Sequence, residues 1–259
     1  MLIGREKQKQ KLLQAFESGY SQFVAVYGRR RVGKTFLVRE TFNYEFTFQH
    51  AGLARGEMRK QLSSWKYSLK QCGMKRPRTP KTWLEAFDML KDFLNTCPEG
   101  KKTVFLDEMP WMDTRNSQFL SALESFWNGW ASARKDILLI ACGSATSWIL
   151  NKLINSKGGL RGRVTAKIKV SPFTLAECER FVTANNLGMG RRQIAECYMV
   201  MGGVPYYWSL LTRSQSLAQN IDSLFFNEDG ELYKEYDTLY ASLFNNPEPY
   251  IKIIGHVDK

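Results

Sequence analysis

The sequence is poor in the residues that build metal sites and disulfide frameworks. It has five widely spaced cysteines without a C-x-x-C pair, and its two histidines, His50 and His256, have no cysteine or carboxylate at ligand spacing. This scarcity argues against a zinc site and against a disulfide framework, and it favours reduced thiols in a cytosolic protein.

Long apolar segments are lacking as well. The longest fully apolar run is "ILLIAC" at 137–142, whereas a membrane-spanning helix needs about 20 residues. The first residues, "MLIGREKQKQ", are charged within five positions and contain no apolar region typical of a secretory signal. We therefore expect a cytoplasmic protein without a membrane partner.

Acidic residues are outnumbered by basic ones. The chain has 37 Lys and Arg against 25 Asp and Glu, a formal net charge of +12. Such an excess attracts phosphate groups of nucleotides, nucleic acids or acidic lipids alike, and so it does not choose between them. A chain of 259 residues accommodates one α/β core, with roughly a hundred residues left for a second, smaller unit.

Apolar strand-like runs alternate with helical patterns along the first part of the chain. Helical spacing is seen at 83–97 and 118–133, and strands are predicted at 23–27, 44–49, 103–107, 137–142 and, as an edge strand, 166–170. This alternation predicts an α/β fold with a mostly parallel five-stranded sheet that is covered by helices on both faces.

Two further regions depart from this pattern. Residues 58–81 are polar and end in "KRPRTPK", which predicts an insertion with one helix and a basic loop. After residue 170 the patterns are helical only, so we expect a core over 1–170 and a small helical domain over 171–240. Residues 241–259 open a further amphipathic segment, from which we expect a truncated domain.

The segment "VYGRRRVGKTFLV" fits the phosphate-loop pattern G-x-x-x-x-G-K-[ST]. Gly28, Gly33, Lys34 and Thr35 occupy its fixed positions, and a predicted strand precedes it while a helical pattern follows. In such a loop, backbone N–H groups surround the β-phosphate, the lysine bridges the β- and γ-phosphates, and the threonine hydroxyl binds magnesium. The alternative is a glycine-rich turn that matches the pattern by chance.

A pair of acidic residues ends the third predicted strand, "TVFLDEMPW". Asp107 could hold a magnesium ion through water, and Glu108 could polarise the attacking water. The alternative is a pair of strand-end acids that cap the next helix, with Pro110 in its first turn.

The fourth predicted strand ends in "CGSATSW". Ser144 is our candidate for a hydrogen bond to the γ-phosphate or the water, because carboxyl ends of parallel strands line the ligand crevice. The alternative is a helix N-cap by Ser144 or Thr146. Downstream, Arg161, Arg163 and Lys167 are candidates for stabilising transition-state charge, or are ordinary surface charges.

Taken in order, these segments resemble the archaeal-type P-loop ATPases, which belong to the signal-transduction ATPases with numerous domains, within the AAA-like group, and also occur in bacteria. The resemblance is carried by "LIGREKQKQKLL", "YGRRRVGKTFLV", "FLDEMPWM", "LIACGSATSW", "GRVTAKIKVSPFTLAE" and "MGGVPYYWSLL". It covers nearly the whole chain.

The resemblance implies ATP and Mg²⁺ as ligands and assigns roles to matching residues. It places Asp107 and Glu108 in the Walker B pair, Ser144 at a sensor-like strand end, and Arg163 in a "GR" motif, in cis or in trans. It places Pro205 of "GVP" in a helical lid, against the base. The remaining nucleotide contacts that it implies are Ile3, Gly4 and Arg5 at the adenine, and the Walker A residues Gly28, Arg29, Arg30, Arg31, Val32, Gly33, Lys34, Thr35 and Phe36.

Two functions from different classes follow. The first is a magnesium-dependent ATPase that acts as a nucleotide-driven switch. The alternative is a nucleic-acid-binding regulator in which ATP only sets the conformation, suggested by "KRPRTPK" and Arg191–Arg192. Relatives of this kind usually continue into a winged helix, and residues 241–259 would be the start of such a domain, truncated here. DNA, bound through this incomplete domain, is therefore one possible partner, and a second copy of the chain in a homo-oligomer is another. A small-molecule kinase is a third, weaker hypothesis.

Overall fold

The computed structural model describes residues 2–235, 248–249 and 252 of the chain. The chain divides into two compact units, Met1–Ser171 and Pro172–Lys259. Much of the second unit's tail, including most of the expected truncated domain over 241–259, lies outside the described residues.

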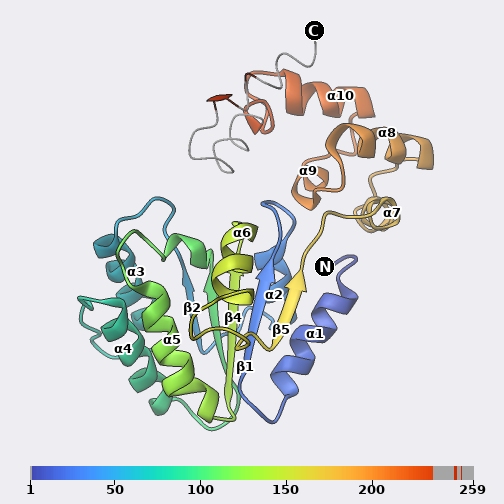
Figure 1. Cartoon of the computed structure of the whole chain (residues 1–259). Helices are drawn as coiled ribbons and strands as arrows, with labels where there is room; N and C mark the ends of the chain where they lie inside the picture. Colours follow the sequence, from blue (N-terminus) through green and yellow to red (C-terminus); the bar gives the residue numbers. More distant parts are fainter. Residues whose placement is uncertain (1, 236–247, 250–251, 253–259) are drawn as a thin grey trace. The chain divides into compact units, whose positions relative to one another are not determined.

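The first unit is built on a five-stranded sheet (Figure 1). The strands lie in the order β2-β3-β4-β1-β5, and every neighbouring pair is parallel. Their bounds are β1 Gln22–Tyr27, β2 Phe48–Ala51, β3 Lys102–Asp107, β4 Ile137–Gly143 and β5 Ala166–Lys169. The predicted fold class is therefore confirmed, and β5 lies at an edge as predicted.

The central strands β3 and β4 are buried along their whole length, which explains why their sequences read as continuous apolar runs rather than alternating ones. Phe105 and Ile140 pack towards α1 (Glu6–Glu17) and α2 (Lys34–Thr41). The opposite face packs against α3 (Met58–Gln71), α4 (Trp83–Thr96) and α5 (Phe119–Gly129). Helices thus cover both faces of the sheet.

The strand predicted at 44–49 is shifted in the structure, because β2 begins at Phe48 and ends at Ala51. Asn43 and Tyr44 have φ angles of +50° and +63°, a left-handed turn conformation that ends the preceding helical segment and is incompatible with a strand. Tyr44 belongs to this turn and Phe46 to the irregular segment that follows it, although both aromatic residues raise the strand propensity of the sequence.

The described part of the second unit is helical, with no strand among its described residues. Its helices begin with a capping box at Thr174 and Glu177. Gly203 leaves no room for a side chain, because a Cβ there would lie 1.9 Å from the Phe173 carbonyl oxygen. The element bounds are α7 Leu175–Ala184, α8 Arg191–Met201, α9 Pro205–Ser209, α10 Leu217–Ile221 and a π-helix, η4, Asp222–Phe226.

Across the described residues, none of the helices combines the length and the apolar character that crossing a bilayer requires.

Candidate phosphate-binding site at the carboxyl edge of the sheet

The loop between β1 and α2 lies at the carboxyl edge of the parallel sheet, where ligands of such sheets bind. Arg31 and Gly33 both adopt left-handed backbone conformations, with φ angles of +64° and +86°. Gly28 is required by close packing, because a Cβ there would lie 2.1 Å from the Val170 carbonyl oxygen at the end of β5. The sequence therefore folds the loop tightly against the neighbouring strand.

Lys34 is the first residue of α2, and its side chain turns back into the loop. The residue is 5% exposed, and Nζ donates a hydrogen bond to the Arg29 carbonyl oxygen at 2.8 Å. Burial lowers the pKa of Lys34, an effect partly opposed by the nearby carboxylates of Asp107 and Glu108. Among the described residues, the only hydrogen-bond partner of this buried ammonium group is thus an uncharged oxygen, at the place where a phosphate would neutralise the charge.

Thr35 and Asp107 meet across the sheet edge. Thr35 Oγ1 donates a hydrogen bond to Asp107 Oδ2 at 2.8 Å, although the two residues are 72 positions apart. Asp107 ends β3, is buried, and its Oδ1 accepts a hydrogen bond from the Glu108 N–H at 2.9 Å. A hydroxyl and a carboxylate oxygen suit Mg²⁺, which keeps several waters and is bound through one or two carboxylates together with substrate phosphates.

Glu108 is held by the end of the neighbouring strand, β4. Its Oε2 accepts hydrogen bonds from the Ser144 hydroxyl at 2.9 Å and from the Ser144 N–H at 3.2 Å. Glu108 has left-handed backbone angles, φ +43° and ψ +44°, which are strained for a residue other than glycine. Ser144 therefore contacts the acidic pair itself.

The capping alternatives are wrong for both segments. Glu108 precedes the short 3₁₀-helix η1 (Met109–Trp111) but makes no side-chain capping hydrogen bond. The N-cap of α6 (Thr146–Trp148) is Ala145, which cannot cap through its side chain, so neither Ser144 nor Thr146 has that role.

Arg5 is buried, with 4% of its surface exposed. Its Nη2 donates hydrogen bonds to the Val32 carbonyl oxygen in the phosphate loop at 3.3 Å and to the Ser171 carbonyl oxygen at 2.7 Å. Ile3 is buried, and Gly4 has a φ angle of +67°. The structure thus brings Arg5 to the back of the loop, and the expected adenine contact of these three residues stays a prediction.

The variable positions of the loop divide by exposure. Arg29 and Arg30 are exposed, Arg31 is half-buried and Val32 is buried in the core beneath the loop. Phe36, in the first turn of α2, is 42% exposed.

Arg163 lies away from this site within the chain. It precedes β5, in which Ala166 pairs with Val24 and Lys169 with Tyr27. The paired stretch is about 10 Å long at about 3.3 Å per residue, so Arg163 stands beyond the amino end of the strand, whereas the phosphate loop follows the carboxyl end. The sequence does not predict this placement, because a motif fixes the order of residues along the chain but not the edge of the sheet at which each residue lies.

Gly203, Val204 and Pro205 belong to the second unit, where Pro205 is the first residue of α9. Their proposed packing against the base is therefore still a prediction.

Gln61 is a residue that sequence reasoning missed. It is fully buried in α3. Its Nε2 donates to the carbonyl oxygens of Leu53 at 2.7 Å, Gly56 at 3.3 Å and Trp111 at 2.8 Å, and its Oε1 accepts from the Leu53 N–H at 2.9 Å. It ties the loop after β2 to η1, directly behind the acidic pair. A glutamine in a polar insertion carries no sequence signal for this role.

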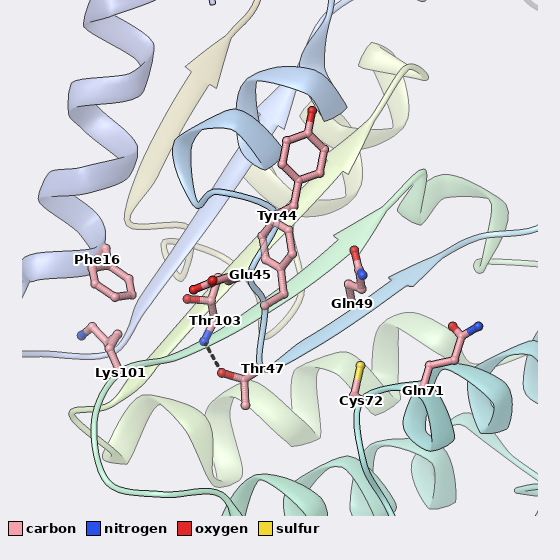
Figure 2. Close-up of a pocket in the computed structure, with 10 residues that line it drawn as sticks. Phe16, Tyr44, Glu45, Thr47, Gln49, Gln71, Cys72, Lys101 and Thr103 are labelled. Atoms are coloured by element: carbon pink, nitrogen blue, oxygen red, sulfur yellow. Dashed lines mark hydrogen bonds between the residues drawn. The ribbon is translucent and has the colours of Figure 1, made fainter. Parts of the chain in front are cut away.

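A cavity lies towards the amino ends of β2 and β3, away from the phosphate loop (Figure 2). It has a volume of about 620 Å³ and is lined by residues that include Phe16, Thr47, Gln49 and Lys101. Lys101 Nζ already donates to three backbone carbonyl oxygens at 2.7–3.0 Å. The Lys101 ammonium group is thus held by the backbone, and the carboxylate of Glu45 also belongs to the lining.

Comparison with known proteins gives one family. A family described as an ATPase domain predominantly from Archaea matches residues 2–211. An uncharacterized protein of Methanocaldococcus jannaschii is 26% identical over 255 residues, which are 98% of this chain and 53% of that protein. The chain therefore spans about half the length of this curated relative.

Three solved structures share the fold. A Walker-type ATPase of Pyrococcus abyssi has a TM-score of 0.66 at 19% identity, over 92% of this chain and 75% of the other. The ORC1 protein of Aeropyrum pernix, solved with DNA, has a TM-score of 0.58 at 14% identity, over 100% and 84%. A signal-transduction ATPase with numerous domains from Pyrococcus horikoshii has a TM-score of 0.53 at 14% identity, over 94% and 33%.

Proposed function

The chain belongs to this family of ATPase domains predominantly from Archaea, and from that premise we propose that it is a magnesium-dependent ATPase that works as a nucleotide-driven switch. ATP binding and hydrolysis are the activity of the domain family. The dependence on magnesium, the roles of single residues and the switch are our proposals.

The observation that carries the proposal is the hydrogen bond between Thr35 and Asp107, directly beside the buried Lys34. In a nucleotide complex, the ammonium group of Lys34 would leave the Arg29 carbonyl and neutralise the β- and γ-phosphates. Thr35 and Asp107 would hold a magnesium ion, which when bound supplies positive charge to the phosphate oxygens.

Glu108 is the proposed general base that orients the attacking water. Its carboxylate is engaged by Ser144, so it must exchange this partner for the water before hydrolysis. Ser144 is then free to donate to the water or the γ-phosphate. We propose that this exchange of partners separates a resting state from a hydrolysing state.

Charge stabilisation by Arg163 fits only a contribution from a second copy of the chain, because the residue lies beyond the opposite edge of its own sheet. We also propose adenine contacts by Ile3, Gly4 and Arg5, and a helical lid that carries Pro205. A cytoplasmic location completes the proposal, since all five cysteines are free thiols and a reducing compartment keeps thiols in that form.

Phosphate release from ATP tests the proposal. Lys34→Ala and Glu108→Gln should each reduce the rate at least 100-fold, in the range found for residues that act on the transition state. Lys7→Ala and Glu17→Gln, at exposed positions of α1, are the matched controls and should retain the wild-type rate. Chelation of magnesium should stop the reaction in every variant, and undiminished release after Lys34→Ala contradicts the proposal.

A further inference from the structure

The excess positive charge of the chain is concentrated in one short segment. Residues 58–81 contain eight Lys and Arg and no Asp or Glu, whereas the other 235 residues contain 29 basic and 25 acidic residues. This segment of 24 residues therefore supplies +8 of the net charge of +12. It consists of α3 and the loop that leads to α4, and neither takes part in the proposed chemistry.

Helix α3 presents this charge outward. Its apolar face, formed by Leu62, Trp65 and Leu69, is buried against the sheet. Arg59, Lys66 and Lys70 follow one another at helical spacing along one edge of this apolar face; Arg59 and Lys70 are exposed and Lys66 is half-buried. The exposed Lys60 and the 60% exposed Tyr67 lie on the side opposite to the apolar face. At about 1.5 Å per residue, the row from Arg59 to Lys70 is about 17 Å long.

The loop extends this row with Lys75, Arg76, Arg78 and Lys81, all of which are exposed. Arg78 pairs with Glu85 at 2.6 Å. Over the part of the chain that the structure describes, the other seven cations of the segment form no ion pair. We call the eight cations with Tyr67 the basic face.

Arg191 and Arg192 form a second basic feature of the sequence, but unlike most cations of the basic face they are both engaged in ion pairs. Arg191 pairs with Glu179 at 2.7 Å and Arg192 with Glu196 at 2.9 Å. These pairs neutralise the charge of α8 locally, so attraction of a polyanion is expected at the basic face instead.

We propose that the basic face binds the phosphate backbone of duplex DNA, independently of base sequence. A duplex carries one negative charge per about 1.7 Å of its axis, so a row of about 17 Å faces on the order of ten phosphate charges. The cations are mainly lysines, which act as point charges and do not read base edges with the bidentate geometry of arginine.

Other polyanions fit this face less well. A membrane-surface helix inserts its apolar side into the lipid, whereas the apolar side of α3 is buried in the protein core. Single-stranded nucleic acid requires several aromatic platforms for successive bases, and this face has one exposed aromatic residue, Tyr67. The major groove of duplex RNA is deep and narrow, whereas that of B-form DNA is wide enough to accept a helix.

The test uses the full chain, a fluorescent duplex of mixed sequence and titrations at 50 to 200 mM salt. The variant is Arg59→Gln/Lys66→Gln/Lys70→Gln. The matched control, Lys7→Gln/Lys9→Gln/Lys11→Gln, removes the same charge from exposed positions of α1. Melting temperatures show whether the wild type and the two variants are folded. The readout is DNA binding itself, which does not require ATP hydrolysis.

We expect the wild type to bind with an affinity that falls steeply with salt. The α3 variant should bind at least tenfold more weakly, with a salt slope reduced by about two to three units at about 0.9 per lost phosphate contact. The α1 control should change affinity by less than threefold. Absence of binding at 50 mM salt, equal losses in both variants, or tighter binding to duplex RNA or to phosphatidylserine vesicles would each overturn the proposal.

Discussion

Replacing Lys34 by methionine separates the phosphate loop's role in ligand binding from its role in folding. The substitution removes the charge and the hydrogen bond to the Arg29 carbonyl but keeps most of the buried volume. A hydrogen bond from a charged group contributes about 1.5–3 kcal/mol. The destabilisation caused by losing this hydrogen bond is opposed by removal of a buried cation, because burying the charge is unfavourable and lowers the pKa of Lys34.

These two effects have opposite signs and similar size, so Lys34→Met should shift the melting temperature of the free protein by no more than about 4 °C, or about 1 kcal/mol. Ligand binding should respond very differently. A nonhydrolysable ATP analogue with magnesium, at 100 times its Kd, stabilises the folded wild type by about 2.7 kcal/mol. For a protein of this size, that corresponds to roughly 5–11 °C.

Thermal unfolding followed by intrinsic tryptophan fluorescence measures both quantities in one experiment. Wild type and the exposed-site control Lys7→Met should show the full shift with ligand, and Lys34→Met should show less than 1 °C. If Lys34→Met retains more than half of the shift, the lysine does not meet the phosphates. If the free variant is destabilised by more than about 3 kcal/mol, the buried cation is a structural group and the opposing-effects argument is wrong.

Three further outcomes follow from contacts in the structure. Gly28→Ala should destabilise the protein by roughly 1–3 kcal/mol in urea unfolding and slow hydrolysis, because its Cβ overlaps the Val170 carbonyl. In a double-mutant cycle of Ser144→Ala and Glu108→Gln, the two losses of hydrolysis rate should not add, with a coupling energy of about 1 kcal/mol or more, because the two side chains are hydrogen-bonded. Hydrogen bonds from Arg134 lower the pKa of Asp136. The ionised Asp136 carboxylate therefore stabilises the folded state at pH values above the unfolded pKa of about 3.9, and this stabilisation is lost as the pH falls further. Asp136→Asn should therefore destabilise by roughly 1 kcal/mol at pH 7, allowing for screening at this partly exposed pair, and by progressively less below pH 4.

Controls are available for each of these. Gly19→Ala, which meets no atom within 4 Å, should leave the unfolding midpoint unchanged. Asp92→Asn, at an exposed position, should have the same small effect at pH 7 and pH 3. Strictly additive rate losses in the Ser144 cycle would show that the two side chains act separately.

The sequence predicts that the phosphate loop and the acidic strand end meet, because each of these two motifs is short and continuous along the chain. Lys34 and Thr35 follow directly from the loop pattern, and Asp107 follows from an apolar strand that ends in an acid. Their meeting across 72 positions follows from the parallel sheet, since the carboxyl ends of neighbouring strands share one edge.

The parts that the sequence does not predict depend on packing. The start of β2 is set by a left-handed turn at Asn43 and Tyr44, where strand propensity favours the wrong boundary. The contact between Ser144 and Glu108 depends on a strained backbone at Glu108. The sequence leaves open whether Arg163 acts in its own chain or in a second copy, because the position of the residue beyond the amino end of β5 is visible only in the fold.

Arg5 gives the first unit an internal tether. One nitrogen of its guanidinium group grips the back of the phosphate loop at Val32 and also the last residue before the second unit, Ser171. A rearrangement of the loop around a triphosphate would therefore either preserve or break the hydrogen bond between Arg5 and Val32. The same nitrogen of Arg5 also binds Ser171, the last residue of the first unit. A single buried arginine therefore joins the phosphate loop to the last residue of the first unit.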